Sequence, residues 1–340
     1  MRPTVPATRR AFLQATIGMA LATRGDRGAL AAAAPGVRVG CLVRDEGAPG
    51  VRGLHLGAED AADAARRLDR VFDVREVATD ADAERLARDR ATVALVGVGD
   101  GDDRGVVAAA ARHGRPFLGI ADAPTGAANA FAVAPPDGAY LDAVVRWVGR
   151  ERPRARWLVV VTEADDIAWR KRALGAARSR GATSVAEAVV PRDALCAADV
   201  LLIGARAAAS PAIAAAIAAV PDALVVVPSG DVAPSTLPRR SARATLWHES
   251  LTRDGAAELN ERFTRRFGCA MTGRDWAAWM AVSILWEAVA RQGNVASTRL
   301  LGHADRFEGH KGRPLVFGAR RHLVQPLYVV AGGRVVLVAG

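Results

Sequence analysis

The chain is poor in several residues that particular folds and binding surfaces require. Its 340 residues contain three cysteines, Cys41, Cys196 and Cys269, which are far apart and share no metal-ligand spacing, so neither a disulfide scaffold nor a zinc ribbon is expected. No run of 18 or more apolar residues occurs, so no membrane-spanning helix is expected. Lysine is nearly absent, since Lys171 and Lys311 are the only two among 46 basic residues.

The basic balance of the chain does not predict a nucleic-acid partner. The formal net charge is +10 at pH 7, and five arginines less one aspartate in residues 1–34 account for +4 of it. The other arginines are interspersed with acids, as in residues 66–70, and no basic stripe is interleaved with aromatic side chains. The charge is therefore interpreted as a solvated basic surface.

The first 34 residues have the layout of an export signal. Residues 8–14 read Thr-Arg-Arg-Ala-Phe-Leu-Gln, which closely resembles the twin-arginine translocation motif. A short apolar segment follows at 15–22, then Arg24 and Arg27, then Ala-Leu-Ala at 29–31 as small residues for cleavage. An amphipathic helix with a chance arginine pair is the alternative. The signal predicts a periplasmic protein exported by the twin-arginine route.

After residue 36, short apolar runs alternate with segments of helical spacing. A hydrophobic share of 51% is typical of a globular chain, and at roughly 150 residues per domain the length suggests two domains. The predicted strands are 37–43, 74–77, 92–98, 116–120, 130–133, 157–161, 185–190, 200–203, 224–227, 244–247, 313–317, 323–331 and 334–339, the last two forming a hairpin. The predicted helices are 58–71, 105–112, 139–148, 167–180, 211–220, 254–267 and 274–291. The repeated βα alternation predicts an α/β fold with two doubly wound parallel sheets.

The common catalytic and cofactor motifs are missing. The turn after the first strand reads Val-Arg-Asp-Glu-Gly at 43–47, which is no dinucleotide-binding glycine motif, and neither a Walker loop nor a Gly-x-Ser-x-Gly elbow occurs. His248 and Glu249 are adjacent, so on a strand they would point to opposite faces and make a poor metal site. We therefore expect no enzyme, no cofactor and no metal.

Two segments of the last third carry a resemblance to a known family. Residues 270–289 (AMTGRDWAAWMAVSILWEAV) and residues 307–317 (FEGHKGRPLVF) resemble segments of the type I periplasmic binding proteins, the leucine/isoleucine/valine-binding kind of ABC-transporter receptor. The resemblance implies a Venus-flytrap fold with lobe 1 at 37–134 plus 250–304 and lobe 2 at 135–249 plus 305–340. It further implies a small-molecule ligand in the cleft between the lobes, hinge closure, docking on a membrane permease and a monomeric state.

Details of the sequence refine what the resemblance implies. Lys311-Gly-Arg-Pro, Arg321 and Gln325-Pro326 are similar to a subgroup associated with quinoprotein (PQQ-dependent) alcohol oxidation. The loops at 121–126 and 162–169 lack the serine-rich turn and the Asp-Tyr-Gly of amino-acid-binding members, which argues against an amino-acid ligand. The alternatives are an accessory protein of a quinoprotein dehydrogenase without a transport role, and an exported enzyme on the same fold.

Candidate ligand-binding residues follow from the rule that open α/β sheets bind ligands beyond the carboxyl ends of their strands. Arg44 or Arg206 would meet an anionic group, and Trp247 or His248 would form one wall. The alternatives are that Arg44 pairs with Asp45 or Glu46 and that Trp247 is hinge packing. The full set of candidates is Arg44, Asp45, Asp100, Asp122, Thr125, Glu163, Asp165, Arg206, Ser229, Asp231, Trp247 and His248, together with Gly99 beside them.

The export signal generates the first prediction. Replacing Arg9 and Arg10 with lysine should retain the precursor in the cytoplasm, because the twin-arginine route depends on the arginine pair that precedes Phe12 and Leu13. Cell fractionation and immunoblotting measure the outcome. Undiminished mature protein in the periplasm would show that the export route is a different one.

Overall fold

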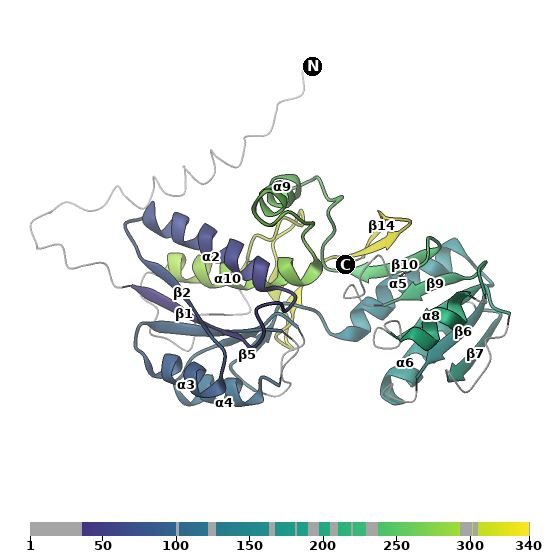
Figure 1. Ribbon diagram of the computed structural model, residues 1–340, viewed down its shortest axis with the longest axis horizontal. Helices are drawn as coiled ribbons and strands as arrows, with labels where there is room; N and C mark the ends of the chain where they lie inside the picture. The colour runs from purple at the N-terminus through teal and green to yellow at the C-terminus, as the bar shows by residue number, and fades with distance from the viewer. Residues whose placement is uncertain are drawn as a thin grey trace, which may run out of the picture. The chain divides into compact units, whose positions relative to one another are not determined.

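The computed structural model describes residues 36–99, 102–121, 127–162, 167–180, 182–189, 197–204, 210–218, 220–228, 237–292, 301 and 305–339 (Figure 1). The predicted signal peptide lies outside the described residues. Two large sheets and a small two-stranded one are flanked by helices, which gives the α/β fold expected from the sequence. Among the helices of the described ranges, none combines the length and apolar character that a bilayer crossing needs.

The first large sheet has five parallel strands in the order β2-β1-β3-β4-β5. The predicted bounds of its strands 37–43 and 92–98 are confirmed, because both are apolar runs covered on two faces, as parallel strands are. In chain order the elements are β1 (Val37–Val43), α2 (Val51–Arg66), β2 (Phe72–Val77), α3 (Asp80–Arg88), β3 (Thr92–Val98), α4 (Arg104–Arg112), β4 (Phe117–Gly119) and β5 (Ala130–Ala132).

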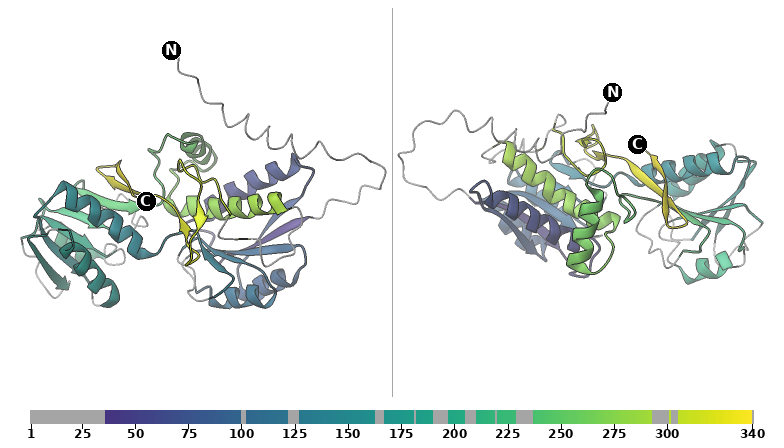
Figure 2. Two further views of the ribbon diagram at one scale, coloured as in Figure 1. Left: turned by 180° about the vertical axis from the view of Figure 1, so that it is seen from behind. Right: turned by 90° about the horizontal axis from the view of Figure 1, so that it is seen from above.

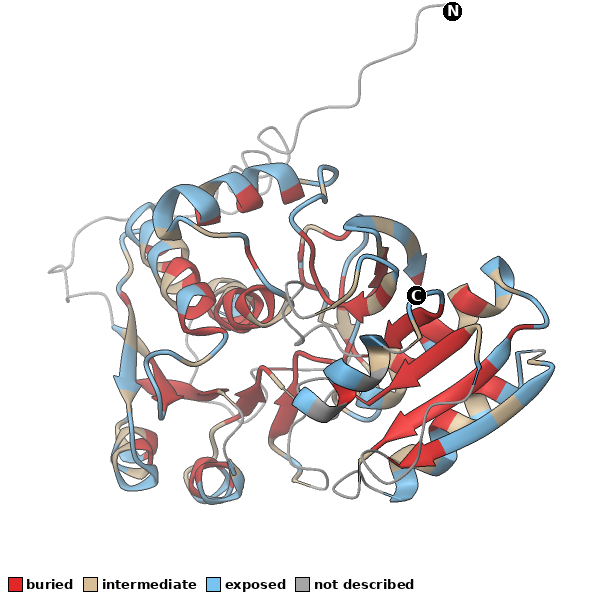
Figure 3. Cartoon of the chain, turned by 45° about the vertical axis from the view of Figure 1, so that its right-hand side comes forward, coloured by how far each residue is buried: buried red, intermediate tan, exposed pale blue. Residues whose placement is uncertain are grey.

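Alternate residues of this sheet face two different helical layers. Leu42 and Leu95 join the cluster formed with α3 and α4, whereas Cys41 and Val96 join the cluster that includes residues of α2 and of α10 (Gly273–Gln292). The alternation follows from the two-residue period of a strand. Figure 1 shows α3 and α4 on one face and α2 and α10 on the other. In Figure 3 the central strands are largely buried, most helices are buried on one side only, and α10 is buried along most of its length.

The second large sheet has seven strands in the order β14-β13-β10-β9-β8-β6-β7. Strands β6 to β10 are parallel. The predicted hairpin of β13 and β14 turns at Gly332 and Gly333, whose φ values are 55° and 76°, and its strand β13 pairs antiparallel with β10. In chain order the elements are α5 (Asp137–Glu151), β6 (Arg156–Val161), α6 (Ile167–Arg178), β7 (Ser184–Val189), β8 (Val200–Ile203), α8 (Pro211–Ala218), β9 (Leu224–Val227), β10 (Ser241–Thr245), β13 (Leu327–Ala331) and β14 (Arg334–Ala339).

The second sheet is also covered on both faces. Leu158 and Val160 of β6 share a cluster with Ile213 of α8, whereas Trp157 and Val159 belong to the cluster that contains residues of α5 and α6. Helix α8 therefore lies on one face of the sheet, and α5 and α6 lie on the other.

Three connections join elements of the first sheet to elements of the second. Residues 133–136 lead from β5 to α5, and residues 246–255 lead from β10 to α9 (Ala256–Phe267), which contacts α2 through the Arg262–Asp60 ion pair. Residues 325–326 lead from β12 (Leu323–Val324), the partner of β11 (Val316–Phe317), to β13. Residue 322 bridges to β5, so the segment just before β13 lies against the first sheet. The predicted lobe boundaries stay a prediction.

Several predicted elements differ from the structure for local reasons. Helix α2 begins at Val51 and not at residue 58, because Gly50 with φ 104° turns the chain into the helix, and it ends at Arg66 before Asp69 with φ 53°. Helix α3 was not predicted. The predicted strand 323–331 is two strands, because Pro326 has no N–H to donate to a ladder.

Helices α2 and α10 pack side by side, as Figure 2 shows, because glycines of α2 leave no side chain at the contact. A Cβ on Gly53 would lie 1.8 Å from the carbonyl oxygen of Asp275, and one on Gly57 would lie 3.1 Å from that of Trp279. Both helices are therefore held at a spacing that only glycine permits.

This spacing predicts the effect of one added methyl group. Gly53→Ala should lower the free energy of unfolding by at least about 2 kcal/mol, because the backbone of α10 has to move away. Gly175→Ala is the matched control, since a Cβ there meets nothing within 4 Å and alanine in an exposed helix adds about 0.5–1 kcal/mol. Denaturant unfolding measures both variants. A Gly53→Ala protein as stable as the wild type would contradict the packing.

Candidate functional site

Four of the twelve candidate residues lie in the described part of the chain: Arg44, Asp45, Trp247 and His248. The first two follow β1 and the last two follow β10, at the carboxyl ends of both strands. The other candidates, Asp100, Asp122, Thr125, Glu163, Asp165, Arg206, Ser229 and Asp231, lie outside the described residues.

Arg44 is held by the loop and helix that neighbour β1. Its Nη2 donates to Oδ1 of Asp80 at 2.7 Å and to the carbonyl oxygen of Asp102 at 3.1 Å, and it lies 3.9 Å from Oδ1 of Asp103. Asp45 instead accepts a hydrogen bond from the backbone N–H of Gly47 at 2.8 Å. The guanidinium therefore pairs with Asp80 and not with its sequence neighbours Asp45 or Glu46.

Sequence reasoning missed Asp80 and Asp103 as members of this cluster. Asp80 is the first residue of α3, where Thr79 caps the helix by accepting from the N–H of Asp82. The available signal was the Thr-x-x-Asp spacing of a helix N-terminus. Asp103 precedes α4, and its partners lie far away along the chain.

Two glycines make room for the two carboxylates. A Cβ on Gly97 would lie 2.3 Å from Oδ2 of Asp103, and a Cβ on Gly105 would lie 2.4 Å from Oδ2 of Asp80. The Asp103 side chain is 16% exposed. Its burial raises the pKa to about 6, which nearby Asp80 also favours and Arg44 opposes. This carboxyl group therefore changes its charge near neutral pH.

Asp102 behaves in the opposite way. Hydrogen bonds from the side chain and backbone of Arg104 lower the pKa of Asp102 to about 2. Arg104 is thus engaged by Asp102, and Arg44 is the guanidinium that faces Asp80 and Asp103.

Trp247 does not offer a free face, which corrects the expectation that it forms a wall of the site. Its side chain is 1% exposed, its Nε1 donates to Oδ1 of Asn260 at 2.7 Å, and its ring stacks on Trp276 with centroids 5.9 Å apart. The alternative reading of Trp247 as packing at a connection therefore describes this structure. The predicted strand also ended too late, since β10 stops at Thr245 and leaves Trp247 in the connection.

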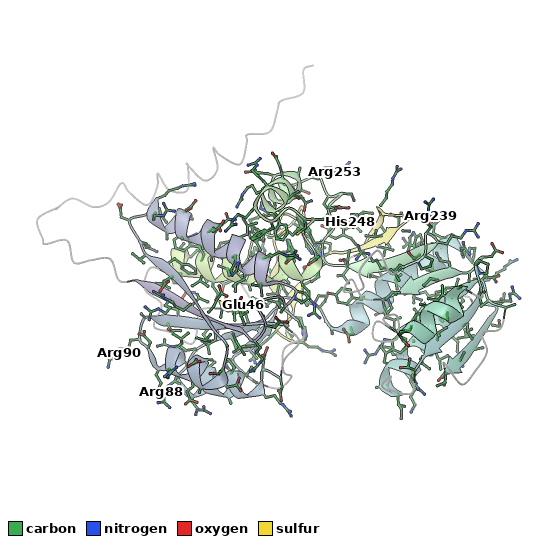
Figure 4. The ribbon with its side chains drawn as sticks, viewed as in Figure 1. Glu46, Arg88, Arg90, Arg239, His248 and Arg253 are labelled. Atoms are coloured by element: carbon green, nitrogen blue, oxygen red, sulfur yellow. The ribbon has the colours of Figure 1, made fainter. Side chains whose placement is uncertain are left out.

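His248 is 7% exposed and also lies in the connection after β10 (Figure 4). Its Nδ1 accepts from the N–H of Ser250 at 3.2 Å and lies 2.8 Å from Oγ of Ser250. Burial lowers the pKa of His248, and Arg243 lowers it further while Glu249 opposes them. The lowered pKa favours the neutral imidazole, and the N–H that Ser250 donates to Nδ1 favours the tautomer with its proton on Nε2.

No group of three or more His, Cys, Asp or Glu side chains in the described ranges could hold a metal ion. Cys41 and Cys269 are free thiols, and burial raises the pKa of Cys41 above its usual range. Cys196 lies outside the described residues.

No family model and no curated protein matches the chain. Solved structures do match it. LivJ from Streptococcus pneumoniae, a branched-chain amino acid transporter substrate-binding protein in complex with isoleucine, has 15% identity and a TM-score of 0.66, over 89% of this chain and 99% of that one. The chain has the type I periplasmic-binding-protein fold. An ABC-transporter substrate-binding protein from Desulfitobacterium hafniense with bound Leu has 14% identity and a TM-score of 0.68, over 88% and 98% of the chains.

A third similar structure binds a different kind of molecule. It is a solute-binding protein of an ABC transporter from Rhodopseudomonas palustris in complex with 3,4-dihydroxybenzoic acid, with 13% identity, a TM-score of 0.60 and coverage of 87% and 92%. At these identities the likeness establishes the fold, and the ligand has to be argued from this chain's own residues.

The raised pKa of Asp103 predicts how stability depends on pH. The folded pKa of about 6 lies above the unfolded value near 3.8, so the native state binds more protons between these values and stability falls as pH rises from 4 to 6. Asp103→Asn should remove this fall and raise the free energy of unfolding at pH 7.5 by about 1–3 kcal/mol. Asparagine keeps the side-chain volume and serves well beside a helix N-terminus.

Asp102→Asn is the matched control, because it removes a neighbouring carboxylate whose pKa lies near 2 and which is the smallest contributor to the shift of Asp103, so most of the slope between pH 4 and 6 should remain. Denaturant unfolding across this pH range measures both variants. A slope that Asp103→Asn leaves unchanged would show that this carboxyl group is ionised in the folded protein well below pH 6.

Proposed function

We propose that the chain is the periplasmic substrate-binding component of an ABC transporter, which binds a small molecule by hinge closure and is exported by the twin-arginine route. The observation that carries the proposal is the pair of doubly wound sheets joined by three separate connections. A binding protein of this design closes two lobes over its ligand, and contacts from both lobes stabilise the closed state.

The similar structures support this reading. Those of LivJ and of the Desulfitobacterium protein contain isoleucine and Leu, and that from Rhodopseudomonas contains an aromatic acid. All three carry the name of a transporter or an ABC-transporter binding protein. A membrane permease is accordingly the proposed partner, and binding without turnover is the proposed activity.

The Arg44 cluster bears on the class of ligand. The guanidinium of Arg44 is already paired with Asp80. The cluster contains three carboxylates, with Asp102 and Asp103 in addition to Asp80, and two arginines, Arg44 and Arg104. A ligand carboxylate at this edge would have to displace Asp80 from Arg44. Hydroxyl or amino groups, in contrast, would find acceptors already in place. This arrangement favours a neutral or cationic polar ligand.

The proposed ligand class agrees with the sequence resemblance to binding proteins linked to quinoprotein alcohol oxidation. That resemblance rests on Lys311-Gly-Arg-Pro, Arg321 and Gln325-Pro326. We therefore include alcohols and aldehydes among the proposed ligands, and the corresponding acids enter the screen below as the contrasting anionic class. The candidate residues other than Trp247 stay part of the proposed site.

A thermal-shift screen tests the function on the mature protein. The panel contains leucine, isoleucine, 3,4-dihydroxybenzoate, short alcohols, aldehydes, the corresponding acids and PQQ. A ligand at 100 times its dissociation constant stabilises the folded state by about 2.7 kcal/mol, which raises the melting temperature by roughly 5 °C. Calorimetry and product analysis follow for each hit. Chemical conversion of the hit would indicate an enzyme. A pull-down with the protein as bait that recovers a dehydrogenase in place of the permease would indicate an accessory protein.

The hit then tests the Arg44 cluster. Arg44→Ala should weaken binding of a neutral polar ligand by about tenfold or more, because Asp80 and Asp103 would no longer be held in place as acceptors for the ligand. Arg90→Ala is the matched control, because Arg90 is an exposed residue in the turn before β3 (Figure 4). Equal affinity of both variants and the wild type would place the site elsewhere.

A further inference from the structure

Lys311, one of the two lysines of the chain, is buried at the place where the connections approach one another. Its side-chain Nζ donates to the carbonyl oxygen of Leu246 at 2.7 Å, to Oε1 of Gln325 at 2.7 Å and to the carbonyl oxygen of Pro326 at 3.1 Å. The residue is 7% exposed. An ammonium group has three N–H donors, so all of them are used.

Gln325 extends this network to the remaining connection. Its Nε2 donates to the carbonyl oxygens of Val133 at 2.5 Å and of Leu323 at 3.5 Å, while its Oε1 accepts from Lys311. Val133 begins the first connection, Leu246 begins the second, and Gln325-Pro326 is the third. Two side chains therefore tie together three segments that are far apart in the sequence.

The charge of Lys311 is stabilised without a carboxylate. Within the described ranges no acidic group forms an ion pair with it. Its Nζ lies 3.9 Å from the ring centroid of Trp276 and 5.3 Å from that of Tyr328, so π-faces add to the three oxygen acceptors. Burial lowers the pKa of Lys311 well below its usual range, and Arg313 lowers it further. The three acceptors oppose this shift, because a neutral amine has only two N–H groups to donate.

An apolar side chain of the same volume would stabilise most buried positions at least as well as a charged one. A buried ammonium therefore costs free energy of folding through its desolvation, and its role can be to specify one arrangement of the groups around it. Here those groups are backbone carbonyls of connecting segments, whose arrangement decides how the two sheets are joined.

Backbone strain marks the same region. His310 and Asp254 have positive φ values of 55° and 57°, and Nδ1 of His310 lies 2.9 Å from the carbonyl oxygen of Asp254. A Cβ on Gly312 would lie 2.7 Å from Oδ2 of Asp254. Non-glycine residues in this conformation cost about 1 kcal/mol or more each and persist where their surroundings hold them. The segment that carries Lys311 is therefore fixed against the second connection.

We propose that Lys311 and Gln325 form a hinge clasp, a polar tie across the three connections that limits the range of angles between the two sheet-containing lobes. The proposal rests on the proposed function, since it assigns to these residues the control of hinge closure. Lys311 acts here as a positioning residue that need not touch the ligand.

The test measures the distance between the lobes without any ligand. Spin labels are placed on the exposed positions of Arg90→Cys and Arg239→Cys, which precede β3 of the first sheet and β10 of the second (Figure 4), in a chain with Cys196→Ser and Cys269→Ser. Cys41 is buried and stays unlabelled. Pulsed electron paramagnetic resonance then reports the width of the distance distribution.

Lys311→Met keeps an unbranched side chain that is one atom shorter and removes its donors, so the distribution should become about twofold wider or more as the tie is lost. Gln325→Met should widen it in the same direction, and it decides the test if the lysine variant does not fold. Lys171→Met, on the exposed face of α6, is the matched control. Val159→Ala in β6 controls for lost stability away from the connections.

An unchanged width in folded Lys311→Met and Gln325→Met would overturn the hinge clasp, and equal widening in Val159→Ala would reduce it to a general effect of stability. Neither result bears on the thermal-shift screen, so failure of the clasp and failure of the proposed function are distinguishable. A screen without hits would leave the width measurement valid.

Discussion

Buried backbone carbonyls need hydrogen-bond donors even where the chain has left a sheet, and this constraint determines the contacts between the connections. Each large sheet satisfies its own ladders, but the connections between them have no ladder. The carbonyls of Val133, Leu246 and Pro326 are met by the side chains of Gln325 and Lys311. Regular structure ends at these connections, and side-chain donors take over.

The second connection shows the same solution once more. Nδ2 of Asn260 in α9 lies within 3.0 to 3.4 Å of the carbonyl oxygens of His248, Glu249 and Leu251, and its Oδ1 accepts from Trp247. The side-chain amide of Asn260 therefore holds the turn that follows β10 in one conformation. The indole of Trp247 is fixed in this turn and stacked on Trp276, which explains why it is unavailable to a ligand in this structure.

The sequence predicts the elements whose pattern is local. Strands β1, β3, β8 and β9 have the predicted bounds, because continuous apolar runs between polar turns identify strands buried on both faces. Helix α3 escapes such reasoning, since its buried residues are only Ala83 and Ala87 among charged neighbours. Amphipathicity built on two alanines leaves little signal in the sequence.

The site is less predictable than the fold because its contacts are long-range. Arg44 is placed correctly at a strand end by the βα alternation, but its partner Asp80 depends on a helix that was not predicted. Lys311 is conspicuous in the sequence by its rarity and by the Lys-Gly-Arg-Pro resemblance, and neither signal indicates its partners. Its acceptors lie at residues 246, 325 and 326, and no spacing rule connects these positions before the fold is known.

Helix α10 links the Arg44 edge of the first sheet to the connections. Near its start, the carbonyl of Asp275 meets Gly53 of α2, and a Cβ on Gly273 would lie 3.1 Å from Oγ1 of Thr245. In the same turn of the helix, Nε1 of Trp276 donates to the carbonyl of Gly309 at 3.2 Å, two residues before Lys311. Neither glycine contact leaves space for sliding, so we expect α10 to move together with the segments that it contacts. Rearrangement at the connections would therefore reach α2, which follows directly on the loop that carries Arg44.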